Sequence, residues 1–129
     1  MIKGGCLCGA YQFEVDGEFT EMMDCFCSMC RKAHGAAFAT FVGCQATDFK
    51  LLQGEDQVGQ YQSSDEGTRS FCRNCGSNLP MMAGDQVYVP AGLLDGDPGV
   101  RTSAHLFVAS KADWVEIVDD ATQYDSYPG

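Results

Sequence analysis

The chain has 129 residues, of which 45% are hydrophobic, so it is long enough to bury a substantial core as one domain. Eighteen acidic residues against eight basic ones give a formal net charge of −10, which disfavours binding to nucleic acid or to anionic membranes. Every apolar stretch is far shorter than the about 20 residues of a membrane span, and the N-terminus lacks the apolar segment of a signal peptide. We therefore expect a single soluble domain over residues 1–129, located in the cytoplasm, with neither nucleic acid nor membrane as partner.

Short strands dominate the predicted secondary structure. Residues 11–16 alternate between apolar and polar side chains, which predicts a strand whose odd-numbered residues face a core. Further short apolar runs, separated by Gly, Asp, Ser and Pro, predict strands at residues 38–42, 49–52, 58–61, 69–72, 79–82, 87–89 and 106–109. The few residues from Cys30 to His34 favour a single helical turn, and the acidic tail of residues 119–129 is expected on the surface. The fold is predicted to be mainly β.

The eight cysteines carry the strongest chemical signal in the sequence. Without an export signal they are expected in a reducing compartment, where thiols bind metal or catalyse reactions instead of pairing as disulfides. Seven of them form the motifs Cys6-x-Cys8, Cys25-x-Cys27-x-x-Cys30 and Cys72-x-x-Cys75. The last motif, followed by Gly76, has the form of a zinc knuckle, in which a tight turn aims two thiolates at one ion and the glycine permits a close backbone approach.

The number of ligands favours two metal sites. Two thiolates cannot complete a tetrahedron, so the two cysteine pairs together suggest one closed structural zinc site, with ligands Cys6, Cys8, Cys72 and Cys75. The triplet would give a second zinc three sulfurs and an open fourth position, which is typical of catalytic zinc. A second structural site, completed by His34 or Cys44, is the alternative for the triplet. A thioredoxin-type dithiol or an iron-sulfur cluster fits the β-rich context and the spacing less well.

Basic residues and histidines near the cysteines are the other candidates for function. Arg31 and Lys32 follow the triplet directly, and Lys3 and Arg73 flank the other cysteine motifs. Positive charge beside the cysteines would suit an anionic ligand such as a glutathione carboxylate. The alternative is that these are ordinary solvated side chains.

Two histidines and three apolar residues complete the candidates. His34 and His105 could each shuttle a proton, support a metal ligand or be a satisfied polar group, and His34, closer to the triplet, is the better candidate for the ligand site. Cys44 ends an apolar run and is expected to be a small buried hydrophobic residue. Phe107 and Trp114 are expected to pack in the core.

The motifs resemble those of a known family across nearly the whole chain. The matching segments are GGCLCGAYQFEV, CFCSMCRKAHGAAFAT, FCRNCGSNL, PAGLLDGDPGV, SAHLFVASKADW and DSYP. In this order they resemble the glutathione-dependent formaldehyde-activating enzymes and the related centromere protein V group. One departure is Phe26, which stands inside the triplet where many members carry histidine and which would remove a polar group from beside the metal.

The resemblance implies a β-tent fold of small antiparallel sheets organised around two zinc sites. It implies one structural zinc on Cys6, Cys8, Cys72 and Cys75, and one catalytic zinc on Cys25, Cys27 and Cys30. The implied activity is that of a carbon-sulfur lyase, which condenses formaldehyde with glutathione to S-(hydroxymethyl)glutathione or reverses that addition. The partners would then be a glutathione-like thiol and a small aldehyde. A non-catalytic zinc-binding interaction module, as in the centromere protein V branch, is the alternative.

Overall fold

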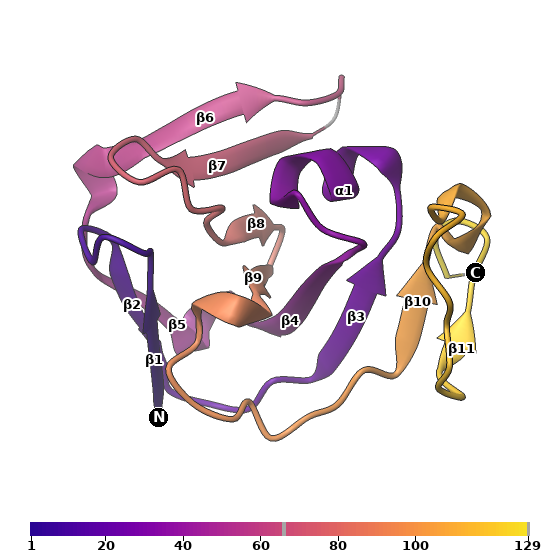
Figure 1. The fold of residues 1–129 in the computed structure, drawn as a ribbon. Coiled ribbons are helices and arrows are strands. Elements are labelled where there is room, and N and C mark those ends of the chain that lie inside the picture. The colour runs from indigo at the N-terminus through magenta and orange to yellow at the C-terminus, as the bar shows by residue number, and fades with distance from the viewer. Residues whose placement is uncertain (66, 129) are drawn as a thin grey trace.

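The computed structural model describes residues 1–65 and 67–128 and confirms a mainly β fold of small sheets (Figure 1). One three-stranded antiparallel sheet has the order β1 (Ile2–Gly5), β2 (Gln12–Val15), β5 (Phe49–Gln53). A two-stranded hairpin consists of β6 (Val58–Gln62) and β7 (Thr68–Cys72). The third sheet has the order β11 (Thr122–Gln123), β10 (Ala104–Leu106), β3 (Glu21–Cys25), β4 (Ala39–Gln45), β9 (Gln86–Pro90), β8 (Met81–Ala83).

Most strand pairs are antiparallel, and the exceptions lie at one edge of the third sheet. There β10 runs parallel to both β3 and β11. Helix α1 (Ser28–His34) follows β3 directly. The 3-10 turns are Ala46–Asp48, Glu55–Gln57, Ala91–Leu93 and Val108–Ser110. In the described residues, no helix is both long and apolar enough to cross a membrane.

The main hydrophobic core lies between the three-stranded sheet and the third sheet. The alternation of residues 11–16 is confirmed, because Phe13 and Val15 are fully buried and Tyr11 nearly so, while Gln12 is exposed. From the third sheet, β4 and β9 contribute the fully buried Val42 and Val87 to the same cluster.

The predicted strands of residues 49–52, 58–61, 69–72 and 87–89 are confirmed, whereas other elements differ from the prediction. The strand expected at residues 106–109 is wrong, because β10 ends at Leu106 and a 3-10 turn follows. Helix α1 starts at Ser28, earlier than predicted. Trp114 is 75% exposed, so its predicted place in the core is wrong, whereas Phe107 does pack against a buried cluster.

Candidate metal centres

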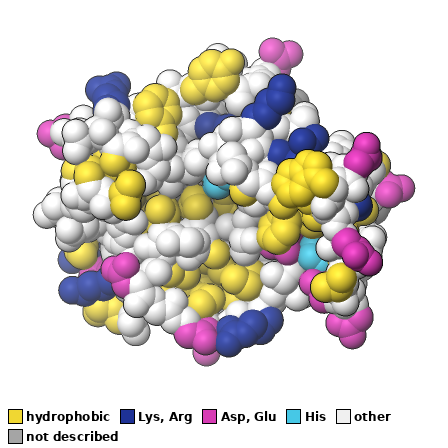
Figure 2. Space-filling view, in the orientation of Figure 1, with side chains coloured by type: hydrophobic (Ala, Val, Ile, Leu, Met, Phe, Trp, Pro, Cys, Tyr) yellow, Lys and Arg dark blue, Asp and Glu magenta, His cyan; other side chains and the backbone are white. Residues whose placement is uncertain are grey.

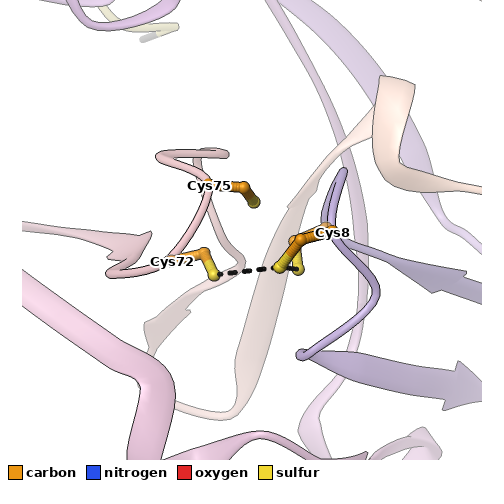
Figure 3. Close-up of side chains that lie close together, drawn as sticks. Cys8, Cys72 and Cys75 are labelled. Atoms are coloured by element: carbon orange, nitrogen blue, oxygen red, sulfur yellow. Dashed lines mark hydrogen bonds between the residues drawn. The ribbon is translucent and has the colours of Figure 1, made fainter.

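The two cysteine pairs meet in space, although they are far apart in the sequence (Figure 3). The sulfurs of Cys6, Cys8, Cys72 and Cys75 all lie within 4.8 Å of one another. Two of the separations are 3.5 Å, from Cys6 to Cys8, and 3.8 Å, from Cys8 to Cys72. A tetrahedral zinc with Zn–S bonds of about 2.3 Å needs sulfurs about 3.8 Å apart, so the four thiols fit a closed zinc site.

Tight turns present these four sulfurs. The turn from Cys6 to Tyr11 joins β1 to β2, and the Tyr11 N–H donates to the Cys6 sulfur at 3.3 Å. After β7, the Gly76 N–H donates to the Cys72 carbonyl at 2.8 Å and closes the zinc-knuckle turn. Gly76 has a φ of 80°, and a Cβ atom there would meet no atom within 4 Å. The glycine is therefore needed for its left-handed backbone, and its close approach to a bound ion stays a prediction.

Donors around this centre stabilise sulfur in its anionic form. Hydrogen bonds from the side chain and the backbone N–H of Ser77 lower the pKa of Cys75 to about 5. The backbone N–H of Ala10 and the side chain of Asn74 lower the pKa of Cys8. Zinc binds thiolates and not thiols, so these donors suit metal ligands.

The triplet forms the second cluster, at the junction of β3 and α1. Cys25 is the last residue of β3, and Cys27 is the N-cap of α1, where its sulfur accepts the Cys30 N–H at 3.3 Å. The first helical turn then brings Cys30 back beside the other two, and the three sulfurs lie within 4.8 Å of one another. Among the described residues, no fourth Cys, His, Asp or Glu completes this group. Three ligands with a free direction fit a metal that also binds a small molecule.

Two thiols of the triplet, Cys25 and Cys30, have pKa values shifted in opposite directions. A hydrogen bond from Cys25, with further donation from Arg69, lowers the pKa of Cys30 to about 5. The same contact with Cys30, together with burial, raises the pKa of Cys25. The lowered pKa favours the thiolate form of Cys30, which is the form in which cysteine binds a divalent metal.

The triplet opens into a cavity of about 510 Å³, here called the triplet cavity. One wall is a face of the third sheet, where Glu21, Met23 and Cys25 alternate along β3. Helix α1 and the β6–β7 hairpin form other walls, and the C-terminal segment adds Tyr127. Such a volume is typical of sites for small molecules.

Among the described lining residues Arg69 is the one cation, and no motif in the sequence had indicated a role for it. It lies on β7, and its Nη2 donates to the Cys30 sulfur at 3.4 Å. Its Nε is buried and has no hydrogen-bond partner among the described residues. A buried donor without a partner is costly, so this N–H is available for an acceptor on a bound ligand. Arg69 is close in sequence to Cys72, but the fold delivers it to the other cluster.

The predicted ligand-binding residues lie outside the described lining of the triplet cavity. The Arg31 guanidinium donates to the carbonyls of Phe26 and Ser110 at 3.3 and 3.2 Å, which ties α1 to the segment after β10. Lys32 is exposed, and His34 packs its ring edge-on against Phe41 at 5.6 Å. A binding role for Arg31, Lys32 and His34 stays a prediction.

Phe26 and Cys44 both point into apolar surroundings. The Phe26 ring is 1% exposed and packs against Phe38 at 4.9 Å and against His105 at 5.4 Å. It is not part of the described cavity lining, so this departure from the family pattern changes the core behind the triplet. Cys44 is fully buried in the main core, as predicted, and lies apart from both clusters.

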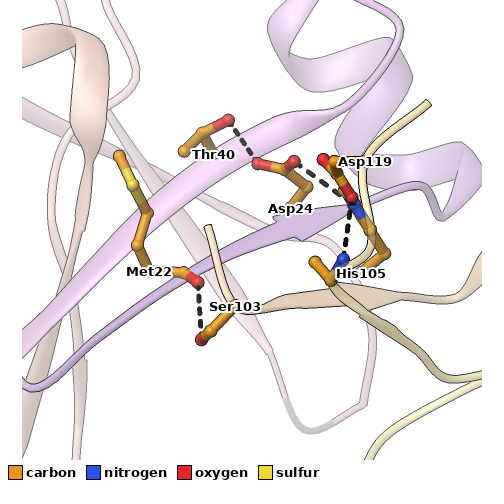
Figure 4. Close-up of polar contacts among 7 residues, drawn as sticks. Met22, Asp24, Thr40, Ser103, His105 and Asp119 are labelled. Carbon is orange, nitrogen blue, oxygen red and sulfur yellow. Dashed lines mark hydrogen bonds and ion pairs between the residues drawn. The ribbon is translucent and has the colours of Figure 1, made fainter. Parts of the chain in front are cut away.

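His105 lies between two carboxylates (Figure 4). It pairs with Asp24 in the β10–β3 register, and both residues are on the face of the third sheet away from the cavity, which Met23 and Cys25 line. Its Nε2 is 2.7 Å from Asp119, and its Nδ1 faces Asp24 at 3.3 Å. Thr40 donates to Asp24 at 2.7 Å. Two hydrogen bonds lower the pKa of Asp119, and the bond to His105 has a larger effect than the bond from the Ala121 N–H. His105 is therefore a buried group that holds the C-terminal segment through its bond to Asp119, while its Nδ1 has no hydrogen-bond partner among the described residues.

We expect Asp119→Ala to loosen this segment. The Tyr124 N–H donates to the His105 carbonyl and the Val108 N–H to the Tyr124 carbonyl, and both bonds depend on the segment staying in place. Amide hydrogen exchange at Tyr124 and Val108 should become about tenfold faster. Asp120→Ala, at an exposed neighbour, is the matched control. Unchanged exchange in Asp119→Ala would show that β11 pairing alone holds the segment.

Fold and sites together define a class: a mainly β protein with one centre of four cysteines and one of three, the second facing a cavity. A sequence model of the family described as glutathione-dependent formaldehyde-activating enzyme matches residues 1–110. The chain belongs to this family.

Individual relatives agree with that assignment. A Halomonas elongata protein, whose name provisionally calls it a glutathione-dependent formaldehyde-activating enzyme, is 32% identical over 128 residues, covering 91% of this chain and 81% of the relative. A Schizosaccharomyces pombe protein named as an uncharacterised lyase is 25% identical, covering 95% of this chain and 89% of its own. A solved Rhodobacter sphaeroides protein superposes with a TM-score of 0.62 at 27% identity, covering 75% of this chain and 91% of that protein.

Proposed function

We propose that the protein is a zinc-dependent carbon-sulfur lyase that makes or breaks the adduct of a thiol and a small aldehyde. S-(hydroxymethyl)glutathione, formed from glutathione and formaldehyde, is the specific adduct that the family description suggests. The observation that carries the proposal is the triplet of thiols inside a cavity of about 510 Å³. The lyase name of the fungal relative supports the reaction class.

The two centres are proposed to have different roles. Cys6, Cys8, Cys72 and Cys75 hold a structural zinc, because four thiolates leave no position for a substrate. Cys25, Cys27 and Cys30 hold the catalytic zinc. When bound there, zinc supplies a Lewis acid that favours the thiolate form of a substrate and polarises an aldehyde oxygen.

The reaction needs charge stabilisation at oxygen and no redox partner. The thiol sulfur bonds to the aldehyde carbon as the C=O π bond opens, and the thiol proton ends on the oxygen. In the reverse direction the S–C bond breaks and the proton returns to sulfur. We assign Arg69 to the oxygen that gains negative charge, because its unpartnered Nε lies beside the triplet. Arg31, Lys32 and His34 remain proposed contacts for the charged ends of the thiol.

The proposal predicts a measurable rate enhancement that depends on Arg69. Zinc-loaded protein should accelerate adduct formation from glutathione and formaldehyde, followed by NMR exchange. Arg69→Gln should lower kcat/KM by about 100-fold, as loss of one preorganised donor does, and keep its zinc. The control is Arg101→Gln, because Arg101 is exposed and pairs with Asp97. If the wild type gave no acceleration over the uncatalysed reaction with any thiol and aldehyde tested, the lyase proposal would be lost.

A further inference from the structure

The walls of the triplet cavity are mainly apolar, right up to the sulfurs. Met23 and Met81 pack against the buried cluster that contains Cys25 and Cys30, and Phe107 packs there too. Met23 lies opposite Phe41 in the β3–β4 register, and Met81 lies opposite Tyr88 in the β8–β9 register. These side chains therefore form one continuous surface beside the triplet.

Charged side chains are scarce in this lining. Among the described lining residues, Glu21 is the one acidic residue and Arg69 the one basic residue. Glutathione carries two carboxylates and one ammonium group, so the lining cannot pair all of them. Acidic residues give the chain its charge of −10. On the face shown in Figure 2 they lie mainly around the margin, with hydrophobic atoms towards the middle.

The position of each substrate group follows from the chemistry of the adduct. The aldehyde-derived carbon is bonded directly to sulfur, so any group on that carbon must lie within a few ångströms of the triplet. The charged ends of the thiol are several bonds further away and can reach solvent. The group that meets the methionine wall is therefore the one contributed by the aldehyde.

We infer that the triplet cavity selects adducts whose aldehyde-derived carbon carries an apolar group, in preference to the adduct of formaldehyde. The inference rests on the proposed function for the identity of the site, and it names the substrate class. Formaldehyde would leave the surface of Met23, Met81 and Phe107 uncovered, whereas an alkyl or aryl group would bury it. Each buried methylene contributes about 0.8 kcal/mol, or about fourfold in affinity. Flexible methionine side chains suit groups of varied shape.

A pair of stable thioethers tests this preference without turnover. S-Methylglutathione and S-hexylglutathione share the tripeptide and differ only in the group on sulfur, and their Kd values for the zinc-loaded protein can be measured by calorimetry. We expect the hexyl compound to bind at least about tenfold more tightly, since several methylenes become buried. Equal Kd values would overturn the inference.

The neighbouring methionines of β8 provide a matched pair of variants. Met81 lines the cavity, whereas Met82 is 65% exposed and lies outside its described lining. Met81→Gln should reduce the hexyl-to-methyl preference to about threefold or less, and Met82→Gln should preserve it. Met29→Gln, on the exposed part of α1 that lines the cavity, is a second variant should Met81→Gln fail to fold. A preference that survives both lining variants would place the hexyl group elsewhere and refute the inference.

Binding and catalysis can fail separately. Loss of all rate enhancement with an intact hexyl preference would contradict the lyase proposal and leave the apolar selectivity standing. Catalysis of formaldehyde addition together with equal Kd values for the two thioethers would support the lyase proposal and overturn the apolar selectivity.

Discussion

Cys72→Ser is expected to lower Tm by more than about 10 °C and to leave one zinc per chain. Cys72 is 1% exposed at the end of β7, and its sulfur lies 3.8 Å from that of Cys8 in the turn between β1 and β2. The four-cysteine centre thus joins two turns that are separated by most of the central chain. Among the described contacts, the hydrogen bond from the Leu7 N–H to Ser77 is another link between them. Thermal unfolding with elemental analysis of zinc measures both effects.

Cys44→Ala is the matched control for that substitution. Cys44 is also fully buried, but it lies in the main core and outside both clusters. Its loss removes one buried sulfur and should cost about 5 °C in Tm, with two zinc ions retained. If Cys72→Ser and Cys44→Ala had the same Tm and zinc content, the four-cysteine centre would not be a structural zinc site.

Cys27→Ser is expected to reduce the zinc content from two ions to one, to keep the fold, and to lower activity by at least about 100-fold. The substitution separates two roles of one side chain. Cys27 caps α1 by accepting the Cys30 N–H, and serine is a strongly preferred N-cap residue, so the helix should persist. A serine hydroxyl is a much weaker zinc ligand than a thiolate, so the triplet should lose its metal.

The neighbouring Ser28→Ala, at an exposed position, should keep both zinc ions and full activity. Circular dichroism and Tm report the fold, and elemental analysis under reducing conditions reports the metal. Two zinc ions in Cys27→Ser, or global unfolding with loss of both, would contradict a separate second centre. A wild type with one zinc would mean that the triplet binds metal weakly.

The triplet could be predicted from the sequence because its geometry is local. One strand end, one N-cap and one helical turn bring Cys25, Cys27 and Cys30 together within six residues. The four-cysteine centre is not local, but the tetrahedral requirement of zinc made the pairing of two incomplete motifs the simplest solution. The number of ligands that zinc requires thus predicted a long-range contact that the hydrophobic periodicity of the sequence could not predict.

Other parts of the site could not be predicted, for identifiable physical reasons. Strand β3 has the sequence Glu-Met-Met-Asp-Cys, in which Asp24 is buried by its contacts with Thr40 and His105, so polarity does not alternate with burial. Strand β1 ends in two glycines, and at Gly4 even a Cβ would lie 2.5 Å from the Phe13 ring. The strand therefore has no alternation of apolar and polar side chains from which it could be predicted. Arg69 reaches the triplet only through the placement of the β6–β7 hairpin.

The two centres also differ in when they can first assemble. During synthesis the triplet is complete as soon as residue 30 has emerged, and its ligands need only β3 and one helical turn. The four-cysteine centre must wait for Cys75, after strands β1 to β7 have been made. Because chains are made from the N-terminus, Cys6 and Cys8 remain an incomplete metal site throughout that interval. If both centres bind zinc as proposed, the order of the cysteines makes metal uptake a two-stage process, in which the later ion joins the β1–β2 turn to the turn after β7.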